Sequence, residues 1–125
     1  RAGSNIRFLG RLDRAGVNAL LAESDALLIP SLWYETYSLV LHEAWAAGLP
    51  VIASDLGVLA ATVRHDVDGV LVAPGDVAAW AATFARLAAH PNELIRMARA
   101  IQPPPSVAQA AAALLQDYDA LLRAR

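Results

Sequence analysis

The chain has 125 residues, of which 57% are hydrophobic and 18% charged, and its formal net charge is −2. This length can bury one core, and the acidic balance without a basic stripe argues against a protein that tracks the phosphates of DNA or RNA. The absence of cysteine excludes disulfides, thiolate metal sites and cysteine nucleophiles. No apolar run reaches the roughly 18 residues that a membrane-spanning helix needs.

Strands and helices are expected to alternate along the chain. Short apolar runs that end at turn residues indicate strands, and apolar residues at helical spacing indicate helices. The expected strands are 6–9, 26–29, 51–53 and 69–72, and the expected helices are 16–23, 38–47, 59–65, 76–89, 91–101 and 106–123. We expect the strand at 26–29 to be buried on both faces, as in a parallel sheet.

This order of elements predicts an α/β fold, a Rossmann-like parallel sheet with flanking helices. Such sheets usually have about five or six strands, so we expect further strands before Arg1 and a longer parent protein. Three consecutive prolines at 103–105 break the chain. They divide it into a partial Rossmann-like domain at 1–102 and a tail at 103–125 that carries an amphipathic helix.

Ligands of parallel sheets bind beyond the carboxyl ends of the strands, which directs attention to the loops 31–38, 54–58 and 73–75. The first loop opens into a helix that Ser38 can cap. Unpaired N–H groups and a partial positive charge of about 0.5 at a helix start can hold a diphosphate. A capped helix with nothing bound has the same sequence, so both interpretations stay open at this point.

Two glutamates favour a ligand that carries a sugar. Helical side chains lean toward the N-terminus, so we expect Glu43 to point toward the loop that carries Glu35. Carboxylates repel a ligand that carries only a phosphate. A nucleotide sugar also carries hydroxyl groups, which can donate hydrogen bonds to the carboxylates, so it fits this pair of glutamates better. Glu43 lies too deep for a capping box, although a glutamate near a helix start also stabilises the helix dipole.

The stretch from Pro30 to Gly57 resembles the E-x7-E signature of family-4-type glycosyltransferases, the glycosyl transferases group 1, which are of GT-B type. Glu35 and Glu43 are the two glutamates of that pattern. Residues 8–10 and 69–76 resemble its flanking elements, and the last helix resembles the one that crosses back onto the amino-terminal domain. The resemblance covers almost the whole chain.

The resemblance implies that the chain is the donor-binding part of a retaining glycosyltransferase, which transfers a sugar from a nucleoside-diphosphate sugar to an acceptor. Neither a metal nor another cofactor is implied. Glu35 would be the catalytic carboxylate that contacts the donor sugar, and Glu43 would hold the ribose hydroxyls. Donor contacts are also implied for the backbone N–H groups of Tyr37, Ser38, Leu39 and Val40 and, beside the base, for Gly10 and Arg11.

The implied partners are a nucleotide sugar and an acceptor sugar or lipid held by an amino-terminal domain, without nucleic acid. The implied location is the cytoplasm, peripheral at the inner membrane in the full-length protein. The basic pair that neutralises the diphosphate in the family belongs to a strand and turn outside this sequence. We therefore expect the isolated chain to be inactive and to associate with itself.

Some positions depart from the family pattern. Thr36-Tyr37-Ser38 stands where a Gly-Phe-Gly-like run is common, and the larger side chains narrow the approach to the sugar. Val58 and Ala61 replace a common glycine and glutamate. Two alternatives remain: another enzyme of the same two-domain architecture, such as an epimerase or phosphorylase, and a truncated module that folds and dimerises without chemistry.

Other polar and aromatic residues have simpler expected roles. We expect His42 to be a helix-face residue and the Asp66–Asp68 segment to form a turn. Trp33 and Tyr34 are expected in the core or at a contact between domains, with packing on the nucleotide or the acceptor as the alternative.

Overall fold

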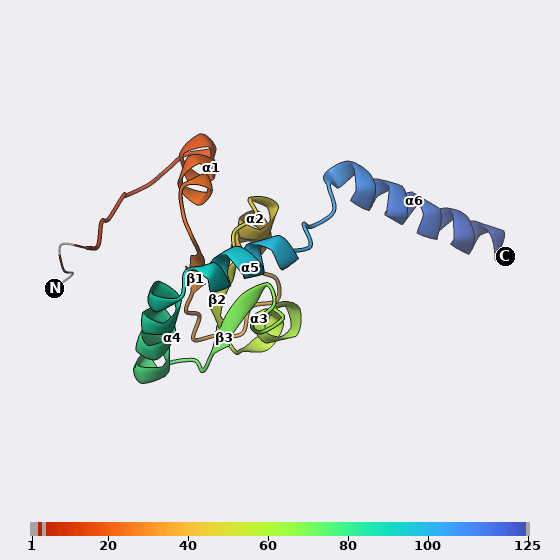
Figure 1. The fold of residues 1–125 in the computed structure, drawn as a ribbon. Coiled ribbons are helices and arrows are strands. Elements are labelled where there is room, and N and C mark those ends of the chain that lie inside the picture. The colour runs from red at the N-terminus through yellow and green to blue at the C-terminus, as the bar shows by residue number, and fades with distance from the viewer. Residues whose placement is uncertain (1–2, 4, 125) are drawn as a thin grey trace.

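The computed structural model of the chain describes residue 3 and residues 5–124. Its body is a three-stranded parallel sheet in the order β1-β2-β3, shown in Figure 1. The strands are β1 (Leu27–Ile29), β2 (Val51–Ser54) and β3 (Gly69–Val72). The helices are α1 (Arg14–Ala22), α2 (Leu39–Ala46), α3 (Gly57–Thr62), α4 (Val77–Ala89), α5 (Asn92–Ala100) and α6 (Val107–Arg123). The expected α/β architecture is confirmed.

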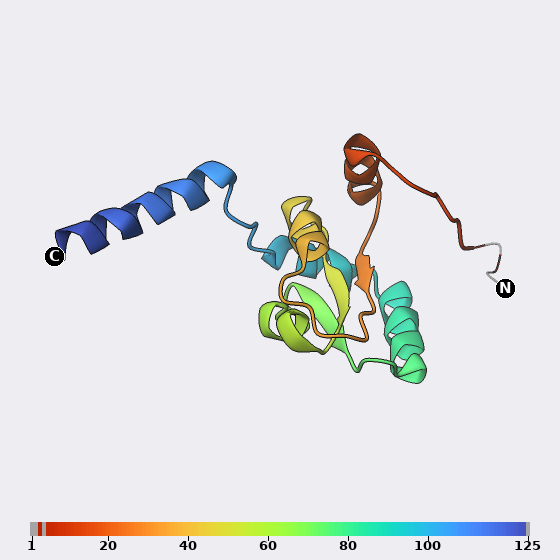
Figure 2. The ribbon, with the colours of Figure 1, turned by 180° about the vertical axis from the view of Figure 1, so that it is seen from behind.

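Helices cover both faces of the sheet, because successive strand residues point to opposite sides. Val51 and Ala53 of β2 pack with α2 and α3, whereas Ile52 packs with α4 and α5. Figures 1 and 2 show α2 and α5 on opposite sides of the strands. The first core consists of Ile29, Leu41, Ala44, Trp45, Leu49, Val51, Ala53, Leu59 and Val63, and the second of Ile52, Val70, Val72, Leu87 and Met97.

The end of α2 follows the expected stop signal. Gly48 has a φ of 74°, and the N–H of Leu49 donates to the carbonyl of Ala44 at 2.9 Å. This arrangement is a Schellman cap. It requires a left-handed residue after the helix, and glycine adopts that conformation at low energetic cost. Pro50 then leads directly into β2, so the end of α2 is joined to the start of this strand with a fixed geometry, at the edge of the sheet opposite to the three loops.

The prediction of a strand at residues 6–9 is wrong. These residues form no strand and are exposed, with Phe8 at 88%. An isolated extended segment needs a neighbouring strand for its backbone hydrogen bonds. In the described residues the backbone pairs of the sheet join only β1 with β2 and β2 with β3, so 6–9 has no neighbouring strand.

The expectation that β1 is buried on both faces is also wrong. Ile29 is buried against α2, but Leu28 is 47% exposed on the opposite face. Leu28 pairs with Ile52, and Ile52 pairs with Val70. Helices α4 and α5 cover Ile52 and Val70, but they do not cover Leu28. The two helices therefore cover β2 and β3 and leave the outer strand open.

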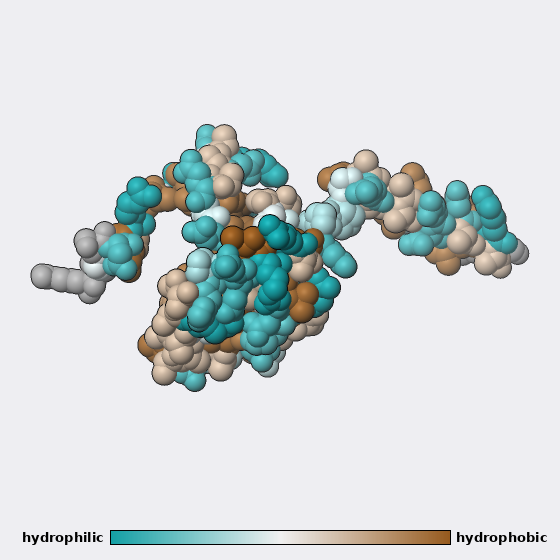
Figure 3. Space-filling view, viewed as in Figure 1, coloured by the Kyte–Doolittle hydropathy of each residue, from teal (hydrophilic) through white to brown (hydrophobic). Residues whose placement is uncertain are grey.

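Helix α6 forms as expected but has no packing partner among the described residues. Its start is fixed by a reciprocal capping box between Ser106 and Gln109. None of its residues is buried, and it extends away from the body of the molecule, with apolar atoms on its surface (Figures 1 and 3). Its large apolar side chains are each more than half exposed: Leu114, Leu115, Tyr118, Leu121 and Leu122.

No helix of the described residues is both long enough and apolar enough to cross a membrane.

Candidate functional site

The three loops that follow the strands meet at one end of the sheet, as expected. Gly57 follows β2 with a φ of 54°, and a Cβ at this position would lie 3.0 Å from the ring of Tyr34 and 3.8 Å from the carbonyl oxygen of Glu35. Gly75 follows β3, and a Cβ there would lie 3.8 Å from the side chain of Leu32. The loop at 31–38 therefore lies against both of the other loops.

Glu35 is held in place by a neighbour from the same loop. The hydroxyl of Ser31 donates to Oε1 of Glu35 at 2.5 Å, and Ser31 is itself buried directly beyond β1. Glu35 is half-buried, and no other group in the described part of the chain bonds to its carboxylate. One carboxylate oxygen is thus fixed, while the other can accept hydrogen bonds from a ligand.

The start of α2 departs from the expected cap. Ser38 occupies the N-cap position with an extended backbone, but its side chain makes no capping hydrogen bond. The residue is only 3% exposed, and its Oγ has no partner among the described residues. A buried hydroxyl without a partner costs about 1–3 kcal/mol. The unpaired hydroxyl therefore lies beside the N–H groups that open α2, of which those of Leu39 and Val40 have no described backbone acceptor.

Aromatic rings fix Tyr37 at this helix start. The rings of Tyr37 and His42 stack with centroids 4.5 Å apart and planes 12° apart, and Trp45 meets the edge of His42 at 6.1 Å. Nδ1 of His42 lies 2.8 Å from the carbonyl oxygen of Ser38 and, since a carbonyl only accepts, Nδ1 is the donor. His42 is a packing residue on the helix face, as expected, and its ring fixes the orientation of the Tyr37 ring, one residue before the N-cap of α2.

Glu43 faces a pocket between α1 and α2. The pocket has a volume of about 300 Å³ and is lined by Arg14, Asn18, Leu21, Glu43, Ala46 and Ala47. Glu35 is not among the lining residues, so the structure does not show the two glutamates in one small volume. Sequence analysis missed Arg14 and Asn18, although their spacing of four residues, followed by Leu21, places them on one face of α1.

Gly10 and Arg11 lie in the exposed segment that leads into α1. Gly10 has a φ of 70°, and Asp13 caps the helix by accepting from the N–H of Gly16 at 2.8 Å. The two residues are therefore close in sequence to Arg14, at the opening of the same helix. Their contact with a base stays a prediction.

Asp66 and Asp68 form a turn, as expected. Asp68 is buried and accepts from the backbone N–H of Arg64 at 2.9 Å and from its Nε at 2.6 Å. Asp66 has a φ of 56°. Among the described residues, no three His, Asp or Glu side chains lie together as a metal site requires.

Trp33 and Tyr34 are not core residues. Both are exposed, and Tyr34 rests on Gly57 at the site end of the sheet. A contact of these rings with another domain stays a prediction.

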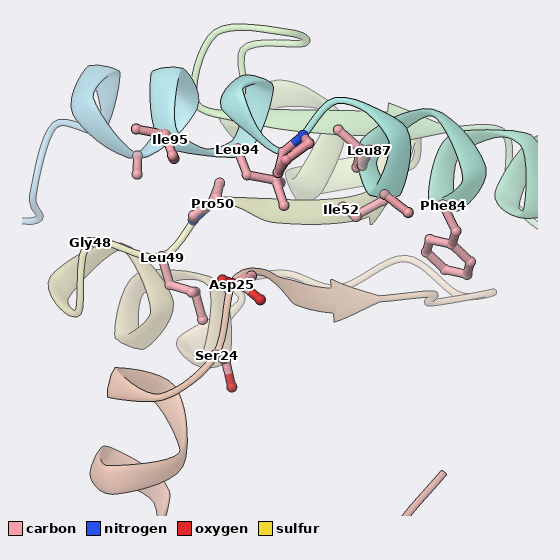
Figure 4. Close-up of a pocket in the computed structure, with 13 residues that line it drawn as sticks. Ser24, Asp25, Gly48, Leu49, Pro50, Ile52, Phe84, Leu87, Leu94 and Ile95 are labelled. Carbon is pink, nitrogen blue, oxygen red and sulfur yellow. The ribbon is translucent and has the colours of Figure 1, made fainter. Parts of the chain in front are cut away.

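A larger pocket of about 550 Å³ lies away from these loops. Ser24 and Asp25 precede β1 and Pro50 precedes β2, so this pocket opens near the amino ends of the strands. Figure 4 shows it between two groups of residues: Gly48, Leu49 and Pro50 on one side, and Phe84, Leu87, Leu94 and Ile95 of α4 and α5 on the other. None of the expected site residues lines it, so its size alone does not make it the functional site.

Comparison with known proteins identifies the family. The family model "Glycosyl transferases group 1" matches residues 1–90. The chain belongs to the glycosyl transferases group 1. This glycosyltransferase chain is 43% identical over 94 residues to glycogen synthase of Mycobacterium tuberculosis, which is 75% of the chain and 22% of the relative. It is 44% identical over 77 residues to the phosphatidyl-myo-inositol mannosyltransferase of Mycobacterium leprae, which is 62% of the chain and 21% of the relative.

Solved structures of GT-B glycosyltransferases share the fold. The chain superimposes on sucrose-phosphate synthase from Thermosynechococcus elongatus with a TM-score of 0.78 and 30% identity, over 98% of the chain and 32% of that enzyme. It superimposes on Anabaena HepE in complex with UDP and glucose with a TM-score of 0.71 and 28% identity, over 79% of the chain and 26% of HepE. The glycosyltransferase chain thus spans about a fifth to a third of the length of these proteins.

Proposed function

We propose that the chain is the donor-binding part of a retaining glycosyltransferase that transfers a sugar from a nucleoside-diphosphate sugar to an acceptor. One observation carries the proposal. A carboxylate fixed by Ser31 lies in the loop that opens α2, where the Oγ of Ser38 is buried without a partner. Such a helix start binds anions through its N–H groups, and the carboxylate binds sugar hydroxyls.

In this proposal the diphosphate lies at the start of α2. The backbone N–H groups of Tyr37, Ser38, Leu39 and Val40 donate to its oxygens, and the buried hydroxyl of Ser38 gains a partner. The donated hydrogen bonds and the helix dipole stabilise the negative charge that grows on the diphosphate as its bond to the sugar breaks. The acceptor oxygen forms the new bond on the same face of the sugar, and the acceptor proton passes to the leaving diphosphate.

Glu35 acts on the donor sugar. Its free carboxylate oxygen accepts a hydrogen bond from a sugar hydroxyl and thereby positions the anomeric carbon beside the diphosphate. Thr36, Tyr37 and Ser38 have larger side chains than glycine, so they leave a narrower approach to the sugar than glycines would, and stacking on His42 fixes the Tyr37 ring.

Glu43 holds the ribose, and Gly10 and Arg11 lie toward the base. The Glu43 carboxylate can accept hydrogen bonds from both neighbouring hydroxyls of a ribose, and its charge strengthens these bonds. The pocket beside Glu43 is open to solvent, so a ligand can reach the carboxylate. The complex of HepE with UDP and glucose, which resembles this chain in fold and sequence, supports a nucleotide-sugar donor.

The acceptor and the place of action follow from the same proposal. The acceptor, a sugar or a lipid, binds another part of the full-length protein, and no metal or cofactor takes part. A relative named phosphatidyl-myo-inositol mannosyltransferase supports a lipid acceptor. In this proposal the full-length enzyme acts in the cytoplasm and touches the inner membrane peripherally. Since transfer needs both substrates held together, we expect no transferase activity from the isolated chain.

Replacement of Glu35 tests the proposed role. In the full-length protein, Glu35→Gln should lower turnover by on the order of 100-fold, because a group that acts on the reacting sugar is lost. Binding of the free diphosphate UDP, which has no sugar, should barely change. Glu23→Gln, at the exposed end of α1, is the matched control and should leave both quantities unchanged.

Two results would count against this assignment. One is unchanged turnover in Glu35→Gln, and the other is an equal loss of UDP affinity and turnover. The anomeric configuration of the product, measured by NMR, should match that of the donor, and an inverted product would disprove retention.

A further inference from the structure

We infer that Arg14 and Asn18 of α1 bind the base of the nucleoside diphosphate, and that Asn18 determines which base the site accepts. The inference rests on the proposed function, in which Glu43 binds the ribose. It assigns to α1 the side of that subsite opposite to α2, although the sequence predicted no ligand contact from α1.

The geometry brings α1 and α2 together around the pocket of about 300 Å³ that contains Glu43. Arg14, Asn18 and Leu21 follow one face of α1, and Ala46 and Ala47 join Glu43 on the side of α2. The two alanines have small side chains, so the space between the helices stays open. The volume lies at the lower end of the range of about 300–1,000 Å³ found for small-molecule sites.

The polar groups of this pocket have no partners among the residues that the structure describes. In the described part of the chain, neither Arg14 nor Glu43 takes part in an ion pair, and the side chain of Asn18 makes no hydrogen bond. If the arginine and the glutamate served only to join α1 to α2, they would be expected to form a salt bridge across the pocket. Their separation leaves both available to a ligand.

The chemistry of these groups matches a nucleoside. An asparagine amide presents both donors and an acceptor, as does the edge of a nucleobase. An arginine guanidinium stacks on flat aromatic rings, and a base is such a ring. Leu21 adds an apolar contact. With Glu43 on the ribose hydroxyls, Asn18 therefore reads the edge of the base and Arg14 covers its face.

Titration of the full-length protein with UDP, GDP and ADP tests this assignment. The unaltered protein should prefer one base. Asn18→Ala should weaken binding of the preferred diphosphate by roughly 10-fold, with a smaller loss for the others, so that the preference shrinks. Arg14→Ala should weaken all three by a similar factor, because every base has a flat face.

The controls are Asn92→Ala and Arg99→Ala, two exposed residues of α5 outside the pocket, which should leave all three affinities unchanged. Glu43→Gln, measured in parallel, separates the two ideas. If it weakens binding while Asn18→Ala and Arg14→Ala leave the affinities and their ratios unchanged, the proposed function stands and this inference is overturned. If the unaltered protein binds none of the three diphosphates, both fall.

Discussion

Gly57 links backbone conformation to the position of the site loop. Its φ of 54° lies in the left-handed region, which costs an ordinary residue about 1–2 kcal/mol. A methyl group at this position would also lie 3.0 Å from the Tyr34 ring, so this ring, which precedes Glu35 in the loop, would have to shift by a few tenths of an ångström. Gly57 therefore gives the Tyr34 ring its place beside the candidate site as well as forming the turn.

We expect Gly57→Ala to lower the free energy of unfolding by about 1–3 kcal/mol and to reduce turnover as well. Gly75→Ala is the matched control, because its φ of 75° is equally strained but the nearest side-chain atom, of Leu32, is at an ordinary 3.8 Å. The control should lose stability alone. Denaturant unfolding and turnover of both variants are the measurements, and equal turnover in the two would contradict a positioning role for Gly57.

At the residue scale, the sequence predicted which loops meet at the carboxyl end of the sheet, where the candidate site lies, but not all of their contacts. The placement of Glu35 beyond β1 followed from the general rule for parallel sheets. Its bond to Ser31 did not, because a hydrogen bond between residues four apart in a loop depends on the path of that loop. Arg14 and Asn18 were missed because two polar residues on a helix face usually only contact solvent.

At the element scale, local sequence patterns predicted nearly every helix, whereas pairing decided the strands. Gly48 and Pro50 determine where α2 ends and β2 begins, and Ser106 with Gln109 determines where α6 starts. The run at 6–9 has an equally apolar pattern but forms no strand, since a strand exists only beside another strand. Likewise, the exposure of Leu28 depends on how far α4 and α5 reach across the sheet, which no local pattern encodes.

The first turn of α2 illustrates the same limit. Serine before a helix normally caps it, and the sequence predicted that Ser38 does so. In the structure its hydroxyl is buried and unpaired instead. A local rule fails here at the position where we propose that a ligand binds, which is where such failures are expected.

At the scale of the whole molecule, a large apolar surface is left uncovered. The exposed leucines of α6, Leu28 on the outer strand and the pocket at the amino ends of the strands are all accessible. Exposed apolar patches of this kind drive association. We therefore expect the isolated chain to associate with itself, and sedimentation velocity at several concentrations measures this.

A chain that ends at residue 102 lacks α6 and should associate less strongly, which identifies the contribution of the helix. The isolated chain of 125 residues would contradict the expectation if it sedimented as a monomer at every concentration.

The central claim is that Glu43 binds the ribose of a nucleotide-sugar donor, and calorimetric titration of the full-length protein with its preferred nucleoside diphosphate tests it most directly. Glu43→Gln removes the charge of an acceptor for two hydroxyls while keeping its size. We expect affinity to fall about 10- to 150-fold, or about 1.5–3 kcal/mol, without a change in melting temperature. Unchanged affinity with a lower melting temperature would show instead that Glu43 only stabilises the dipole of α2, and would contradict the account.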